Sequence, residues 1–150
     1  SVAIGRAEGF RQILDDHPEF RIIYSKSGDF LRSRGYELAV EFLEQYEDID
    51  VIFSHNDGMT LGAIEAMEER GIRPGIDIVI VTIDAQQAAI DALREGKVNC
   101  VIECNPKTGP DIINLAEKLA AGESIPKLQY VHEEVFYETD DLSLVAPRGY

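Results

Sequence analysis

The segment from residue 51 to residue 67 constrains the fold of this chain more than any other. It opens with the apolar run 51–53, which is typical of a buried parallel strand. The polar residues 54–57 follow, and an amphipathic helical pattern begins directly after them. Asp57 can cap that helix, since its side chain can accept from the free amides of the first turn. Asn56 is then left at the carboxyl end of a strand, where open α/β sheets bind their ligands.

The rest of the chain alternates in the same way. The more polar pattern of the last strand is typical of a sheet edge, and glycines at positions 71, 96 and 122 supply helix ends. This alternation predicts an α/β fold: a doubly wound, mostly parallel, Rossmann-like sheet with helices on both faces and right-handed crossovers. We expect helices at 6–16, 31–46, 57–70, 86–95 and 108–121, and strands at 21–25, 51–53, 76–83, 98–104 and 129–137.

Composition excludes several classes of function. The 150 residues suit one folded domain, and the formal charge of −14 opposes binding to nucleic acid or to anionic membrane surfaces. We interpret the acidity as a solubilising surface rather than an acidic docking face. Cys100 and Cys104 lie on one predicted strand, about 13 Å apart, too far for a disulfide, so we expect both to face the core.

Polar residues follow each predicted strand. Parallel strands place such residues on one edge of the sheet, and planar carboxylates and carboxamides can bond neighbouring hydroxyl groups in fixed geometry. An aromatic ring such as Phe30 can lie against a sugar ring, and Arg6 adds a rigid fork of donors. The pattern predicts an uncharged, polyhydroxylated ligand. The strand-end residues are Ser27, Asp29, Phe30, His55, Asn56, Asp57, Asp84, Glu103 and Asn105.

Several of these residues also have a purely structural interpretation. Asp57 is more simply a helix cap than a ligand contact, and Phe30 more simply a core aromatic. Glu103 alternates with Cys104 and so could face solvent. Asn56 and Asp84 are harder to explain structurally, because each ends an apolar strand, where a polar group is costly without a partner.

No signal for catalysis or metal binding is present in the sequence. There is no glycine-rich phosphate loop, no G-x-S-x-G elbow and no H-E-x-x-H pair. His55 and Asp57 could share a face, but no third metal ligand is nearby in sequence. We therefore assign no catalytic residue, no metal ligand and no cofactor, and expect a binding module rather than an enzyme.

Five segments, in order and spacing, resemble a known family. They are residues 6–10, 27–30, 55–63, 82–84 and 103–106. Together they resemble the C-terminal half of type I periplasmic sugar-binding proteins of ABC transporters, nearest to galactofuranose-binding members and more distantly to ribose-binding ones. Ile83 stands where the ribose-binding relatives have an aromatic residue, and Cys104 stands near their glutamine, which implies a different ring preference.

The resemblance implies a receptor that closes on one monosaccharide at a hinge and delivers it to the membrane permease of an ABC transporter. The sugar is a pentose or hexose, with a furanose form among the candidates. The protein is then periplasmic or extracellular, and lipid-anchored if it comes from a Gram-positive cell. The positions that match ligand contacts in this lobe are Arg6, Phe30, Asn56 and Asp84, with Glu103 as a further contact.

The resemblance also bears on domain organisation. The series opens on a helix, so we expect the preceding strand and the N-terminal lobe to be missing and residues 1–150 to form a C-terminal lobe. Helix 108–121 should cross the hinge and pack on the missing lobe. The exposed apolar surface should make the fragment self-associate.

One alternative within the same fold is the effector-sensing core of a lac-repressor-type transcription regulator. Such a protein carries a helix-turn-helix upstream of the core. Segment 103–106 and the chain end at 147–150 resemble the transport branch more closely. An enzyme that converts sugars is the third hypothesis, and no motif supports it.

Overall fold

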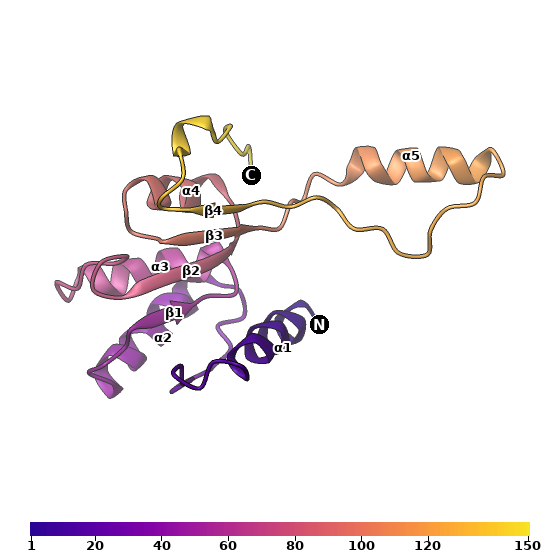
Figure 1. Cartoon of the computed structure of the whole chain (residues 1–150). Helices are drawn as coiled ribbons and strands as arrows, with labels where there is room; N and C mark the ends of the chain where they lie inside the picture. Colours follow the sequence, from indigo (N-terminus) through magenta and orange to yellow (C-terminus); the bar gives the residue numbers. More distant parts are fainter.

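The computed structural model describes residues 1–150. Helices and strands alternate through the middle of the chain, as the sequence predicts (Figure 1). Gly71 and Gly96, both with positive φ, follow the ends of α3 and α4, where amides beyond each helix donate to its last carbonyl groups. The elements are α1 (Val2–Leu14), α2 (Arg32–Gln45), β1 (Val51–Phe53), α3 (Asp57–Glu68), β2 (Val79–Asp84), α4 (Gln87–Arg94), β3 (Cys100–Glu103), α5 (Gly109–Ala120), β4 (Val135–Tyr137) and the short 3-10 helix η1 (Leu142–Leu144).

The four strands form one sheet in the order β1-β2-β3-β4. The first three strands are parallel, and β4 pairs antiparallel with β3 at the edge. The register places Phe53 beside Val81 and Asp84 beside Glu103. The predicted α/β class, the mostly parallel sheet and the edge position of the last strand are thus confirmed.

The core lies on one face of the sheet. Alternate strand residues such as Ile80, Val101 and Phe136 point to this face, where α3 and α4 cover them with Met67 and Ile90. Ile80, Met67, Ile90 and Val101 are completely buried. Helix α2 packs beside α3, and its Leu43 also contacts this core.

The opposite face is only partly covered. The ring of Phe10 in α1 stacks on Phe53, with ring centroids 4.3 Å apart, so the helices do lie on both faces. No residue of α1 is buried, however, and Val51 and Val79 on this face remain 40% and 41% exposed. The part of this sheet face that α1 does not cover therefore exposes apolar side chains to solvent.

Three local predictions were wrong. Residues 21–25 form no strand, because they find no neighbouring strand for a hydrogen-bonded ladder; Tyr24 instead donates to Glu41 of α2. Cys104 lies just beyond β3 and is exposed, while only Cys100 is half-buried. The first helix begins at Val2 rather than at residue 6, which puts Arg6 in its second turn.

Helix α5 stands apart from the sheet at the end of two long connecting segments (Figure 1). None of its residues is buried, and Ile112, Ile113 and Leu119 are each more than half exposed. Its apolar side chains therefore have no partner within residues 1–150.

The contact between α2 and α3 depends on glycine. A Cβ on Gly62 would clash with the backbone of Arg32, whereas a Cβ on Gly9 in α1 would meet nothing within 4 Å. We expect Gly62→Ala to destabilise the fold by about 1–3 kcal/mol, because the helices must separate. Gly9→Ala, the matched control, should stabilise by about 0.5–1 kcal/mol. Urea unfolding followed by circular dichroism tests both; a Gly62→Ala protein as stable as the parent would contradict this packing.

Candidate functional site

Asn56, not Asp57, caps α3. Its backbone is extended, with φ −159°, and its Oδ1 accepts from the Met59 amide at 3.0 Å. Asp57 lies one residue inside the helix, where its carboxylate accepts instead from the Thr82 hydroxyl at 2.8 Å and from the Gln86 amide at 2.7 Å. The predicted cap role of Asp57 was therefore wrong, because partners at the end of β2 engage its side chain.

Asn56 also contacts the turn that carries Phe30. Its Nδ2 donates to the Phe30 carbonyl at 3.2 Å, which leaves the amide group one further N–H and further acceptor capacity. Asp29 and Phe30 adopt φ of 52° and 59°, an unfavourable conformation for non-glycine residues. The Phe30 side chain is not part of the core: the residue is 42% exposed, so its ring is accessible at this edge.

Arg6 reaches across from α1 to the same strand ends. Its Nη2 donates to Asp84 Oδ1 at 3.0 Å, and its Nη1 donates to the His55 carbonyl. Burial raises the pKa of Asp84 above its ordinary value, and the Arg6 guanidinium opposes that rise. Burial and the nearby arginines lower the pKa of His55, so its imidazole is neutral at pH 7. Arg6, Asn56, Asp84 and the Phe30 turn thus meet at one edge of the sheet.

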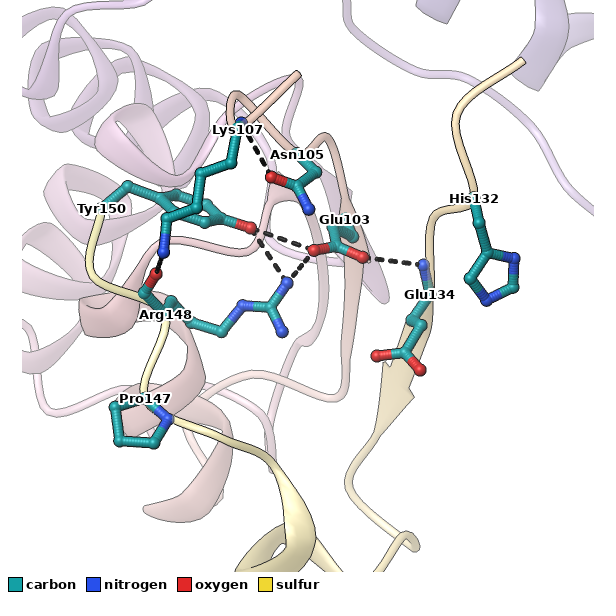
Figure 2. Close-up of a pocket in the computed structure, with 8 residues that line it drawn as sticks. All are labelled: Glu103, Asn105, Lys107, His132, Glu134, Pro147, Arg148 and Tyr150. Carbon is teal, nitrogen blue, oxygen red and sulfur yellow. Dashed lines mark hydrogen bonds and ion pairs between the residues drawn. The ribbon is translucent and has the colours of Figure 1, made fainter. Parts of the chain in front are cut away.

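Glu103 is beside Asp84 in the sheet, but other groups occupy its carboxylate. The residue is 5% exposed, so the solvent-facing interpretation was wrong. Its Oε1 accepts from Arg148 and, at 3.0 Å, from the Tyr150 hydroxyl; its Oε2 accepts from the Glu134 amide at 3.0 Å. Figure 2 shows these groups converging on Glu103. No hydrogen bond joins it to the other four predicted residues.

Arg148 and Tyr150 are not among the residues predicted for the site. They belong to the chain end, which folds back so that the Gln87 amide donates to the Tyr150 carbonyl at 2.9 Å. The Arg148 guanidinium also lies over the Phe136 ring, 5.1 Å from its centroid. The only sequence signal was an arginine and a tyrosine near the chain end, too general to identify a partner for Glu103. A cavity of about 320 Å³ lies beside this cluster (Figure 2).

No group of three His, Cys, Asp or Glu side chains is arranged to hold a metal ion. The helices of the structure are all too short or too polar to cross a membrane.

Comparison with known proteins identifies the family. A family model described as a periplasmic binding protein domain matches residues 1–124. The chain belongs to this family. It is 33% identical over 143 residues to the galactofuranose-binding protein of Escherichia coli, covering 93% of this chain and 45% of that protein. It is 30% identical over 126 residues to the ribose import binding protein of Salmonella typhimurium, covering 83% of this chain and 41% of that one.

Solved structures agree with this assignment to the periplasmic binding proteins. A Mycobacterium smegmatis protein in complex with β-D-fucofuranose superposes with a TM-score of 0.85 at 43% identity, over 91% of this chain and 45% of that one. The arabinose-transporter binding protein of Shewanella sp. ANA-3, bound to L-arabinofuranose, gives a TM-score of 0.86 at 34% identity, over 91% and 46%. The chain thus spans about half the length of the relatives it matches.

The Glu103–Arg148 pair offers a stability test in this periplasmic-binding-protein fold. Arg148→Ala should cost about 3–5 kcal/mol of unfolding free energy, because it leaves a buried carboxylate without its counter-charge. The double variant Glu103→Gln/Arg148→Met should recover most of that loss, since it removes both charges. Arg73→Ala, which breaks the exposed pair with Asp77, is the control and should have a much smaller effect. Equal losses for Arg148→Ala and Arg73→Ala in urea unfolding would contradict the buried pair.

Proposed function

We propose that this chain is the C-terminal lobe of a solute receptor that captures a monosaccharide for uptake by an ABC transporter. The observation that carries the proposal is the meeting of Arg6, Asn56 and Asp84 at the carboxyl ends of β1 and β2. Ligands bind at this edge in open α/β sheets. The proposed role is binding without chemistry.

The charges of the site suit an uncharged polyol. The Arg6 guanidinium and the Asp84 carboxylate offset one another, so the pair favours neither an anion nor a cation. It still offers both donors and acceptors, and Asn56 keeps one further N–H and acceptor capacity for a hydroxyl group. The exposed Phe30 ring provides an apolar surface for the C–H face of a sugar.

The class of sugar follows from the relatives. One is named for galactofuranose, and two solved relatives hold β-D-fucofuranose and L-arabinofuranose. We take the furanose form of a hexose or pentose as the ligand class of this chain. We propose Glu103 as a further contact only at the rim of the sugar site, because the Glu103 carboxylate is already bonded to Arg148 and Tyr150.

The complete receptor has a second lobe. The chain spans 45% of its galactofuranose-binding relative, and the exposed apolar side chains of α5 would be covered by that lobe. In this arrangement α5 crosses the hinge and the sugar lies between the lobes.

The receptor is periplasmic or extracellular, anchored by lipid in a Gram-positive cell, and its macromolecular partner is the membrane permease. The relatives named above are not gene regulators, and nothing in the chain favours that alternative.

Substitution of the hydroxyl-binding residues tests the function. In the two-lobed protein, Asn56→Ala and Asp84→Ala should each raise the sugar Kd about 5- to 150-fold, since each leaves bound hydroxyls unpaired at a cost of about 1–3 kcal/mol. Asp77→Ala, at the opposite end of β2, removes an exposed carboxylate and should leave Kd unchanged. Calorimetric titration with L-arabinose, D-fucose, D-galactose and D-ribose gives the measurement. Unchanged affinity in both site variants would remove them from the site.

The oligomeric state tests the two-lobe arrangement. We expect residues 1–150 alone to self-associate and to bind sugar at least 100-fold more weakly than the two-lobed protein, roughly the loss of two or three hydrogen bonds. The two-lobed protein should be a monomer, because the second lobe covers the apolar surface. Light scattering and calorimetry on the two proteins provide the comparison. A monomeric 150-residue chain with micromolar sugar affinity would overturn the arrangement.

A further inference from the structure

The buried carboxylate of Asp57 lies between the two strand ends that form the proposed sugar site. Asp57 is completely buried at the first position of α3, next to the cap residue Asn56. Its two oxygens reach across to β2: Oδ1 accepts from the Thr82 hydroxyl at 2.8 Å, and Oδ2 accepts from the Gln86 amide at 2.7 Å. Thr60 extends this network, with its Oγ1 2.6 Å from Thr82 Oγ1. One side chain thus joins the end of β1 to the turn that follows β2.

That turn has a conformation that its residues do not favour. Asp84 has φ of 127° and Ala85 has φ of 61°, both in the region that favours glycine. Such backbone persists only where surrounding contacts hold it, and it is concentrated at functional sites. Two hydrogen bonds hold this turn. The Asp84 carbonyl accepts from the Cys104 amide of the next strand end at 3.2 Å. The Gln86 amide, the first one after Asp84 and Ala85, donates to Asp57.

The consequence concerns the direction in which Asp84 points. With the Gln86 amide fixed, the strained turn directs the Asp84 carboxylate to Arg6, 3.0 Å away. Without an acceptor at Gln86, the turn can relax towards ordinary φ values, and the Asp84 carboxylate would move with it. Asp57 itself is fully buried and bonded at both oxygens, so it has no role as a sugar contact.

We propose that Asp57 is the positioning residue of the sugar site: by holding the Gln86 amide it maintains the strained Asp84–Ala85 turn and so presents Asp84 to the ligand. This inference rests on the sugar-binding function proposed above. It adds a residue that acts through Asp84, without contact to the ligand.

The state of Asp57 is sensitive to pH. Burial raises its pKa from an ordinary 3.8 to about 6, against the opposing bonds from Gln86 and Thr82. The charged groups that face it are Asp84, which raises its pKa further, and Arg6, which lowers it. Above pH 6 both oxygens accept and the Gln86 amide is held. Below pH 6 the carboxyl group is protonated and becomes a poorer acceptor, so sugar affinity should fall as the pH drops through about 6.

The experiment compares three forms of the two-lobed protein: the parent, Asp57→Asn and Thr82→Val. Sugar Kd is measured by calorimetry between pH 5 and pH 8 with L-arabinose and D-fucose. Asp57→Asn should weaken binding roughly tenfold at pH 8, equivalent to ~1.4 kcal/mol, and should lose the inflection near pH 6. Thr82→Val keeps the Gln86 contact, so it should bind normally at pH 8 and show its inflection at higher pH, since the Thr82 bond lowers the pKa of Asp57.

A second readout does not depend on sugar or on the variants. In the parent protein the amide proton of Gln86 should titrate with a midpoint near pH 6 in nuclear magnetic resonance spectra, because its acceptor is the titrating group. This measurement remains available if Asp57→Asn fails to fold.

Two results would overturn the proposal. One is a Gln86 amide that does not titrate; the other is an Asp57→Asn protein with parental Kd and an unchanged inflection, which would assign the titration to Asp84. If the proposed sugar site itself is wrong, the result differs: the Asn56→Ala and Asp84→Ala proteins would then also have the sugar Kd of the parent. If those two variants lose affinity while Asp57→Asn does not, the sugar site stands and only the positioning role is wrong.

Discussion

A buried carboxylate is costly without hydrogen-bond partners. Asp57, which follows β1, finds its two partners at Thr82 in the neighbouring strand β2 and at the Gln86 amide just after that strand. Its oxygens have to reach Thr82 and Gln86, and this requirement fixes where α3 begins. The cap position therefore falls to Asn56. The bond from the Gln86 amide holds the turn after β2, where Asp84 meets Arg6. A structural need of the fold thus places the three polar groups that we assign to the sugar.

The two ends of the sheet edge are built differently. At the Asn56 and Asp84 end, the guanidinium–carboxylate pair is also largely covered, but Asp84 is 24% exposed and keeps one oxygen free for a ligand. At the Glu103 end, the chain terminus folds back, and Arg148 and Tyr150 take up the carboxylate. The Glu103 side chain is 5% exposed and both of its oxygens already accept hydrogen bonds, so this ion pair serves the fold. For this reason we propose that the sugar binds chiefly at the Asn56 and Asp84 end, with Glu103 only at the rim of the site.

The sequence predicted most of the architecture because its signals are local and strong. β-branched runs indicated β2 and β3, and glycines marked helix ends. The polar residues after β1 and β2 predicted the edge at which we propose the sugar site. Segment 21–25 shows the limit of such signals: it has the composition of a strand, but a strand also needs a neighbour to pair with. The cap was misassigned for a related reason. Asp57 is a good cap by propensity, yet its long-range partners Thr82 and Gln86 are 25 and 29 residues away in sequence. Contacts of Glu103 with Arg148 and Tyr150 span still more of the chain, and no local pattern reports them.

A crystal structure of the two-lobed protein with bound L-arabinose or D-fucose would show whether these residues bind the sugar. We expect a furanose between the lobes, with its hydroxyl groups bonded to Arg6, Asn56 and Asp84, and with Asp57 still bonded to Thr82 and the Gln86 amide. Neither Glu103 oxygen should exchange its Arg148, Tyr150 or Glu134 partner for the sugar. A sugar held elsewhere, or one that leaves the side chains of Asn56 and Asp84 without a ligand contact, would contradict this expectation.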